Sequence, residues 1–160
     1  MKRCLIIHTD GNTYNNPTLK CIIDLLREHY IDIDIRFPVS NAPMPNINGI
    51  KLLPYGIIYS IIKKIIFDKI CSKTFGLISV VFEMLFYYQK YDLIIAVDRQ
   101  GLIEAGFLSK LTKTPVVLFS FEIMFENETS KVFKRLERSA SKFVNHWFIQ
   151  DELRAKYLQI

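Results

Sequence analysis

Short, strongly hydrophobic runs recur along the chain and are separated by polar or amphipathic stretches. Residues 4–8 form a continuous apolar run, which is typical of a strand covered on both faces in a parallel sheet. Residues 31–37 instead alternate between apolar and charged side chains, which predicts a strand with one face in the core. Similar patterns predict further strands at 50–53, 91–97, 115–120 and 143–149.

The segments between these runs have the spacing of helices. Asn16 and Pro17 form a favourable helix start, because asparagine caps free N–H groups and proline fits the first turn. Apolar residues then recur at helical spacing as far as Tyr30. The same spacing predicts helices over residues 55–70 and 75–88. A further helix has Ile103, Phe107 and Leu111 on its apolar face, and the next has Val132, Phe133, Leu136 and Ala140. A last helix is predicted from Gln150 onward.

Strands that alternate with helices predict the fold class. The order indicates an α/β fold, with a Rossmann-like, doubly wound parallel sheet. Ligands of such sheets bind at the carboxyl ends of the strands. The predicted ligand-binding edge of the sheet therefore consists of the loops after His8, Val97, Ser120 and Ile149.

Composition is consistent with one globular domain of this kind. The 160 residues are 50% hydrophobic, enough for one sizeable core but too few for two domains. Three widely spaced cysteines fit reduced thiols in the cytoplasm. The net charge of +5 favours anionic partners, but no nucleic-acid-binding motif accompanies it, so nucleic acid is not expected. No metal is expected either, because His8, His29 and His146 lack ligand spacing.

Isoleucines at helical spacing occur together with Lys63, Lys64, Lys69 and Lys73 over residues 55–73. The lysines interrupt the apolar stretch too soon for a membrane span. Such a helix fits an anionic membrane surface, but it fits equally a helix that packs its isoleucines on the sheet and leaves its lysines in solvent. Both interpretations stay open.

The loop after the first strand contains Gly11, Asn12 and Thr13. Backbone N–H groups between a strand and a helix can receive an anion or sugar hydroxyls. The loop has neither of the glycine patterns of dinucleotide-binding and phosphate-binding loops. The alternative is a simple turn that uses the backbone freedom of Gly11.

The predicted strand at 91–97 is followed directly by Asp98, Arg99, Gln100 and Gly101. A carboxylate, a guanidinium and an amide at the carboxyl end of a strand suit a polyhydroxylated ligand. The alternative is that Asp98 only caps the next helix and Arg99 is a solvated loop residue.

Glu122 follows the next strand and faces the same predicted edge. Its apolar neighbours would favour acid–base chemistry if they bury it, and the alternative is a carboxylate that only fixes its own loop. Glu137 has Lys134 at helical spacing and Arg138 next to it in sequence, which predicts ion pairing on a solvated face.

Four segments together resemble a known family. They are Tyr91–Gly101, Pro115–Glu122, Arg135–Arg138 and Phe148–Ala155, the last with a strand followed by Gln-Asp-Glu-Leu-Arg-Ala. These segments are similar to the N-terminal domain of group 1 (family four) retaining glycosyltransferases. The likeness covers residues 91–158 and is only architectural over 1–50.

The resemblance implies a GT-B enzyme with two domains. The N-terminal domain receives the acceptor, and the C-terminal domain binds the nucleotide sugar without a required metal or other cofactor. Residues 1–160 are then expected to be the acceptor-side domain, without the donor-binding domain. The implied acceptor is a glycan or a lipid-linked sugar in cell-surface polysaccharide synthesis, at the cytoplasmic face of a membrane.

The resemblance also assigns positions. Gly11, Asn12 and Thr13 would flank the interdomain cleft, Asp98 to Gly101 and Glu122 would meet the acceptor, and Gln150, Asp151 and Arg154 would approach the domain junction. Many relatives have a Gly-Gly loop and histidines where this chain has Gly11, Asp98 and Glu122, so the roles of those histidines do not transfer. The alternatives are a non-catalytic Rossmann-like module for interaction or membrane docking, and half of a sugar-nucleotide epimerase.

Overall fold

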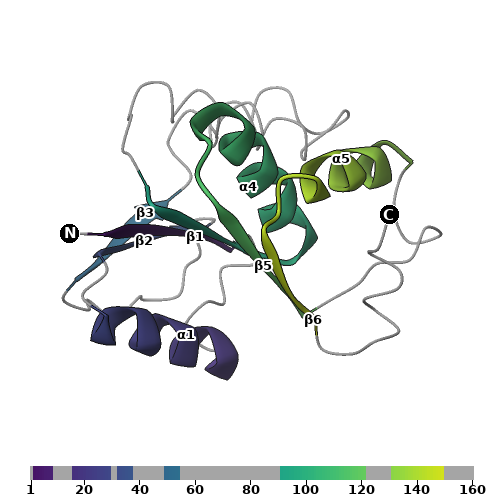
Figure 1. Ribbon diagram of the computed structural model, residues 1–160. Coiled ribbons are helices and arrows are strands. Elements are labelled where there is room, and N and C mark those ends of the chain that lie inside the picture. Colours follow the sequence, from purple (N-terminus) through teal and green to yellow (C-terminus); the bar gives the residue numbers. More distant parts are fainter. Residues whose placement is uncertain are drawn as a thin grey trace, which may run out of the picture.

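A six-stranded, fully parallel sheet organises the chain (Figure 1). A computed structural model describes residues 2–8, 16–29, 32–37, 49–54, 91–121 and 131–149. The strand order is β3-β2-β1-β4-β5-β6, which confirms the predicted Rossmann-like α/β class. The elements are β1 (Arg3–Ile7), α1 (Pro17–Glu28), β2 (Asp32–Phe37), β3 (Ile50–Pro54), β4 (Leu93–Val97), α4 (Asp98–Thr112), β5 (Val116–Ser120), α5 (Lys131–Ser141) and β6 (His146–Ile149).

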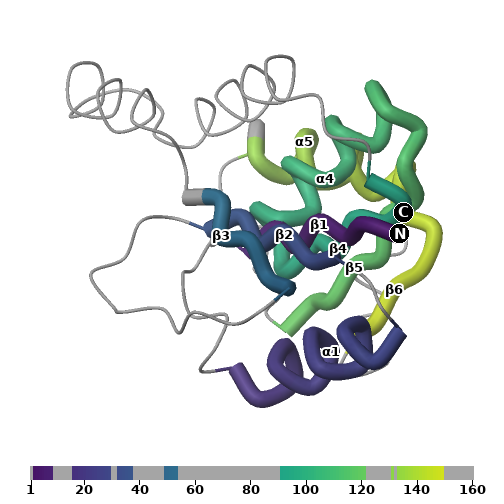
Figure 2. Tube along the Cα trace, turned by 90° about the vertical axis from the view of Figure 1, so that its left-hand side faces the viewer, coloured from purple at the N-terminus to yellow at the C-terminus, as the bar shows by residue number. Residues whose placement is uncertain are grey.

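Helices cover the two faces of the sheet in a way that follows the chain order. Figures 1 and 2 show α1 on one face and both α4 and α5 on the other. The chain moves outward from β1 through β2 to β3, and from β4 through β5 to β6 in the opposite direction. Neighbouring strands β1 and β4 therefore form the switch point of a doubly wound sheet, where ligands of such folds bind.

Each face of the sheet has its own hydrophobic core. On the α1 face, Leu19 and Ile23 of the helix pack against strand residues that include Ile6, Ile33 and Ile95. On the α4 face, the helix residues Leu102, Ala105 and Leu108 pack against alternate positions of β1, β4 and β5. Burial of β1 and β4 on both faces explains why their sequences are continuously apolar.

Helix α1 begins where the sequence predicts. The side chain of Asn16 accepts hydrogen bonds from the backbone N–H groups of Thr18 and Leu19 at 3.0 and 3.2 Å, and Pro17 is the first helical residue. Asparagine caps typically contribute about 1 kcal/mol, so the entry into α1 is determined locally.

The apolar face predicted for α4 is partly wrong. Ile103 is buried, but Leu111 is 61% exposed, and the side facing the sheet is formed by Leu102, Ala105 and Leu108. Burial is almost continuous from Gly101 to Gly106, because α4 packs on the sheet on one side and on α5 on another. A helix that is buried on several sides does not show one clear apolar stripe in its sequence.

Two glycines allow α4 to approach its neighbours closely. A Cβ atom at Gly101 would lie 2.6 Å from the carbonyl oxygen of Ile7 in β1. A Cβ atom at Gly106 would lie 2.6 Å from Cβ of Ala140 and 2.8 Å from its backbone Cα and oxygen. Any side chain larger than the hydrogen of glycine would therefore require the backbone to move at either position.

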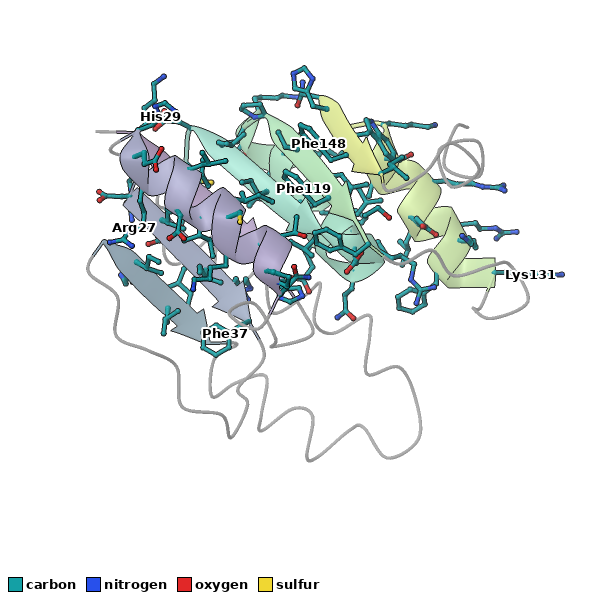
Figure 3. The ribbon with its side chains drawn as sticks, turned by 90° about the horizontal axis from the view of Figure 1, so that it is seen from below. Arg27, His29, Phe37, Phe119, Lys131 and Phe148 are labelled. Atoms are coloured by element: carbon teal, nitrogen blue, oxygen red, sulfur yellow. The ribbon has the colours of Figure 1, made fainter. Side chains whose placement is uncertain are left out.

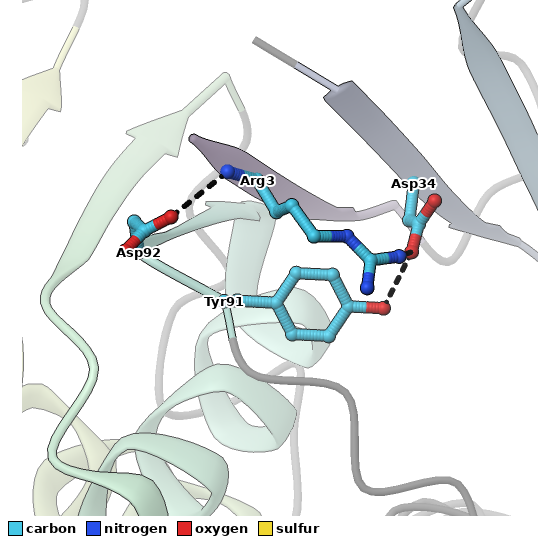
Figure 4. A network of polar contacts seen from close by, with 4 residues as sticks. All are labelled: Arg3, Asp34, Tyr91 and Asp92. Atoms are coloured by element: carbon cyan, nitrogen blue, oxygen red, sulfur yellow. Dashed lines mark hydrogen bonds and ion pairs between the residues drawn. The ribbon is translucent and has the colours of Figure 1, made fainter. Parts of the chain in front are cut away.

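The polar face predicted for β2 is also buried. Asp34 and Arg36 are each 3% exposed, so the prediction that only one face of this strand lies in the core is wrong. Asp34 receives a hydrogen bond from the hydroxyl of Tyr91 at 2.7 Å and pairs with the Arg3 guanidinium at 3.0 Å (Figure 4). Burial, together with the adjacent Asp34 carboxylate, raises the pKa of Tyr91, so this hydroxyl stays a donor.

The ends of the last two elements differ slightly from their predictions. Residues 143–145 form the turn before β6, so the strand is shorter than the predicted 143–149. Lys134 Nζ and Glu137 Oε2 lie 3.0 Å apart in α5, as the spacing predicts, but the Glu137 side chain is only 8% exposed. The predicted ion pair is confirmed. The prediction that it lies on a solvated face is wrong, because this side of α5 turns toward the protein.

Some predictions concern residues outside the described ranges. They include the helices at 55–70 and 75–88, their lysines, and the helix from Gln150 onward. Within the described ranges, none of the helices combines the length and hydropathy needed to cross a bilayer.

The contact at Gly106 generates a stability prediction. Gly106→Ala should lower the free energy of unfolding by about 1 to 3 kcal/mol, since the new methyl group meets the backbone of Ala140. Helix propensity alone would give the opposite sign, by about 1 kcal/mol. Urea unfolding measures the change, with Lys110→Ala on the exposed side of the same helix as the control. Stabilisation by Gly106→Ala would contradict the close packing of α4 and α5.

Two cysteines should differ in reactivity. Cys4 is fully buried in β1, and burial raises the pKa of its thiol to about 12, whereas Cys21 is exposed on α1. Because the thiolate is the reactive form, iodoacetamide at about pH 8 should alkylate Cys21 and spare Cys4 until the protein unfolds. Peptide mass mapping measures both sites in one sample. Alkylation of Cys4 at the rate of Cys21 in folded protein would exclude the described position of β1.

Candidate functional site

Asp98 stands at the turn between β4 and α4, at the carboxyl edge of the sheet. It follows the last residue of β4 directly and is the first residue of α4. Its φ of 54° lies in the left-handed region, which aspartate and asparagine enter more readily than most residues. This conformation turns the chain sharply from strand to helix at a single residue.

The carboxylate of Asp98 ties the end of β4 to the end of β5. Its Oδ1 accepts a hydrogen bond from the backbone N–H of Phe121, with a nitrogen–oxygen distance of 2.6 Å. The alternative that Asp98 only caps α4 is wrong, because its carboxylate holds Phe121 of the neighbouring strand end, and Val97 stands at the N-cap position without a side-chain bond. The negative charge still lies in the first turn, where the helix dipole favours it.

Three more of the predicted residues complete the first turn of α4. Arg99 and Gln100 are partly exposed, and the Arg99 guanidinium lies over the ring of Phe133 in α5, 5.4 Å from Cζ to the ring centroid. Gly101 is buried against Ile7. The structure thus brings Asp98, Arg99 and Gln100 together at the switch point, with Gly101 as the packing residue beneath them. Their contact with an acceptor stays a prediction.

A row of three phenylalanines begins at Phe121, which bonds Asp98, and lies on the α1 face of the sheet. The rings of Phe121 and Phe119 are 6.5 Å apart, and those of Phe119 and Phe148 are 4.7 Å apart and nearly parallel. Figure 3 shows Phe119 and Phe148 on neighbouring strands, and Phe148 is 56% exposed. Polar groups of the β4–α4 turn therefore border a partly exposed aromatic surface.

Sequence reasoning missed a buried ion pair beneath this edge. Nε of Arg36 lies 4.0 Å from Oε2 of Glu104, and both side chains are at most 4% exposed. Arg36 is aligned with Ile7 near the ends of β2 and β1, and its carbonyl accepts the backbone N–H of His8 at 3.0 Å. The available signal was Glu104 itself, a carboxylate inside the apolar run from Leu102 to Gly106. Its pairing with a strand residue far away in sequence had no local signal.

The other predicted site residues lie outside the described ranges. They are Gly11, Asn12, Thr13, Glu122, Gln150, Asp151 and Arg154. The convergence of Glu122 with Asp98 therefore stays a prediction. In the ranges that are described, no cluster of three or more histidine, cysteine, aspartate or glutamate side chains could hold a metal ion.

Solved structures with the same fold are glycosyltransferases. Sucrose-phosphate synthase from Thermosynechococcus elongatus matches with a TM-score of 0.69 and 11% identity, over 99% of this chain and 45% of that chain. A second structure of that synthase matches with a TM-score of 0.63 and 11% identity, over 99% of this chain and 81% of the other. Phytolacca americana UGT2 complexed with UDP-2-fluoro-glucose and pterostilbene matches with a TM-score of 0.51 and 8% identity, over 77% of this chain and 31% of that chain.

These similarities define the class of fold. The synthase and UGT2 have the GT-B architecture, so the GT-B resemblance seen in the sequence is confirmed at the level of the fold. The chain spans less than half the length of the first synthase structure and about a third of the UGT2 structure. No protein-family model matches the sequence, and a comparison with curated proteins gives no match.

The geometry of Asp98 predicts an order of stabilities for three substitutions. Asp98→Asn keeps an acceptor oxygen and tolerates the left-handed backbone, so it should cost least. Asp98→Gly removes the hydrogen-bond acceptor, but glycine adopts a φ of 54° without strain. Asp98→Ala removes the hydrogen bond and also strains the backbone, so it should lower the free energy of unfolding most, by about 2 to 4 kcal/mol. Urea unfolding of the three variants measures this order. Equal losses for the alanine and glycine variants would show that the left-handed conformation imposes no cost.

Proposed function

We propose that this chain is the acceptor-binding domain of a retaining glycosyltransferase. The enzyme would transfer a sugar from a nucleotide sugar to a glycan or lipid-linked acceptor in cell-surface polysaccharide synthesis. The observation that carries the proposal is the polar turn of Asp98, Arg99 and Gln100 at the switch point of a GT-B-like sheet. The similarity to glycosyltransferase structures supports the reaction class.

The chemistry of the turn suits recognition of sugar hydroxyls. A carboxylate accepts several hydrogen bonds, whereas a guanidinium and an amide donate them, so the turn presents both kinds of partner to a hydroxyl. The bond from Phe121 fixes the Asp98 carboxylate, and stacking with Phe133 restricts Arg99. Fixed polar groups lose less conformational entropy when they bind a ligand. The aromatic row that starts at Phe121 would adjoin the less polar parts of an acceptor.

The donor would bind elsewhere in this proposal. The described part of the chain has no glycine-rich phosphate loop between β4 and α4, where Asp98 and Arg99 stand instead. In the proposed enzyme a second domain supplies the nucleotide-sugar site, and transfer takes place between the two. The Asp98 edge orients the acceptor hydroxyl toward that second domain.

Binding measurements on the 160-residue chain test this division. Calorimetry with UDP-, GDP- and TDP-sugars should give no submicromolar dissociation constant. A screen of oligosaccharides and polyprenyl-linked sugars should give an acceptor whose affinity falls about tenfold or more in Asp98→Asn and in Arg99→Ala, because each loses a charged hydrogen-bonding partner.

The control variant is Arg27→Ala, an exposed substitution in the last turn of α1, away from the carboxyl edge of the sheet. It should leave acceptor affinity unchanged, and all three variants should keep the parent's cooperative unfolding. Submicromolar binding of a nucleotide sugar would contradict the acceptor-side assignment. Undiminished acceptor binding by both Asp98→Asn and Arg99→Ala would reject the proposed edge.

A further inference from the structure

Helix α5 carries a straight row of positive charges on one side. Lys131, Arg135, Arg138 and Lys142 follow one another at spacings of four, three and four residues, with Lys142 in the turn just after the helix. At 100° per residue these four positions fall within a sector of about 60° over about 16 Å of helix axis. All four side chains are exposed. We call these four residues the basic row.

The packing of α5 points the basic row away from the protein. Ala140 lies about half a turn away from the row, is 1% exposed and touches α4 at Gly106. The close approach at Gly106 fixes the rotation of α5 about its own axis. Figure 3 shows Lys131, at the amino end of α5, directed outward from the body.

The acidic side chains of α5 and of the middle of α4 are buried. Glu137 pairs with Lys134 at 3.0 Å and turns inward, and Glu104 lies beneath α4. Among residues 91–121 and 131–149, Asp92 before β4 is the one exposed acidic side chain and Asp98 is partly exposed, whereas the exposed cations are Lys110, Lys113 and the four members of the basic row. This part of the surface is therefore complementary to an anionic partner.

The contact between the two helices is made on the inner side of α5. Arg99, beside Asp98, lies over the ring of Phe133, which is seven residues before Ala140 and so on the same side of α5 as Ala140. The candidate site and the basic row therefore lie on opposite sides of α5. Parallel cations on a helix that lies along the body contact a plane of phosphates, and the row includes no aromatic or amide side chain that could read bases.

We propose that the basic row of α5 docks the domain on an anionic phospholipid surface. This inference rests on the proposed function only in its purpose, since docking would bring the domain to a bilayer in which an acceptor is anchored. The binding itself requires only phosphate headgroups. It is thus measured on vesicles that contain no sugar-linked lipid.

Co-sedimentation of the 160-residue chain with vesicles tests the proposal. The chain should bind vesicles of phosphatidylcholine with phosphatidylglycerol, bind poorly to phosphatidylcholine alone, and dissociate as salt rises from about 0.1 M to 1 M. The triple variant Lys131→Glu/Arg135→Glu/Lys142→Glu should partition about 100-fold more weakly. The reason is that each cation near an anionic surface contributes about 1 kcal/mol, and tenfold corresponds to 1.4 kcal/mol.

A matched triple variant controls for net charge. Lys2→Glu/Lys20→Glu/Arg27→Glu changes the total charge equally but affects exposed residues off the α5 layer, and it should bind vesicles like the parent. Circular dichroism melts establish that each variant folds. A milder triple glutamine variant of the α5 residues replaces the glutamate variant if the latter does not fold.

Three outcomes would overturn the proposal. The first is absence of binding by the parent, and the second is an equal loss in both triple variants, which would show that only net charge matters. The third is tighter binding of a short DNA duplex than of vesicles, again lost in the α5 variant, which would make the partner a nucleic acid. Asp98→Asn should bind the sugar-free vesicles normally, so failure of acceptor binding and failure of docking are separate results.

Discussion

Helix α4 packs tightly between the sheet and α5, and this packing fixes the geometry of the β4–α4 turn. Gly101 brings the first turn of the helix against the carbonyl of Ile7, and Gly106 brings the third against Ala140. A helix that starts so close to the sheet leaves no room for a gradual connection from β4. The left-handed Asp98 provides the sharp turn, and its bond to Phe121 holds that turn against β5.

The same face of the sheet contains charges that must be compensated inside the protein. Asp34 is paired toward the amino ends of the strands by Arg3 and Tyr91, whereas Arg36 is paired toward the carboxyl ends by Glu104. Removing one partner of such a pair leaves a buried charge at a cost of several kcal/mol. These pairs therefore hold β1, β2, β4 and α4 together from both ends, and the second pair lies close beneath the candidate site.

Helices α4 and α5 also connect the proposed activities. The proposed acceptor edge begins α4, the basic row runs along the outer side of α5, and Arg99 contacts Phe133 on the inner side of α5. A movement of α5 would consequently be transmitted to Arg99. On the opposite face of the sheet, α1 packs by its apolar stripe in the same hydrophobic cluster as Phe119 and Phe121, so this helix adjoins the aromatic row and not the basic row.

Features that depend on local chemistry could be predicted from the sequence: the apolar runs of β1 and β4, the Asn16 cap, and the pairing of Lys134 with Glu137. The sequence also placed Asp98 and Arg99 at a strand end, because strand and helix periods change there. The tertiary structure was needed to show that Asp34 and Arg36 are buried, that Leu111 is exposed, and that Asp98 bonds to Phe121. Each of these features depends on residues that are distant in sequence. The local pattern of apolar and polar residues does not say which helices or strands pack together, or how closely.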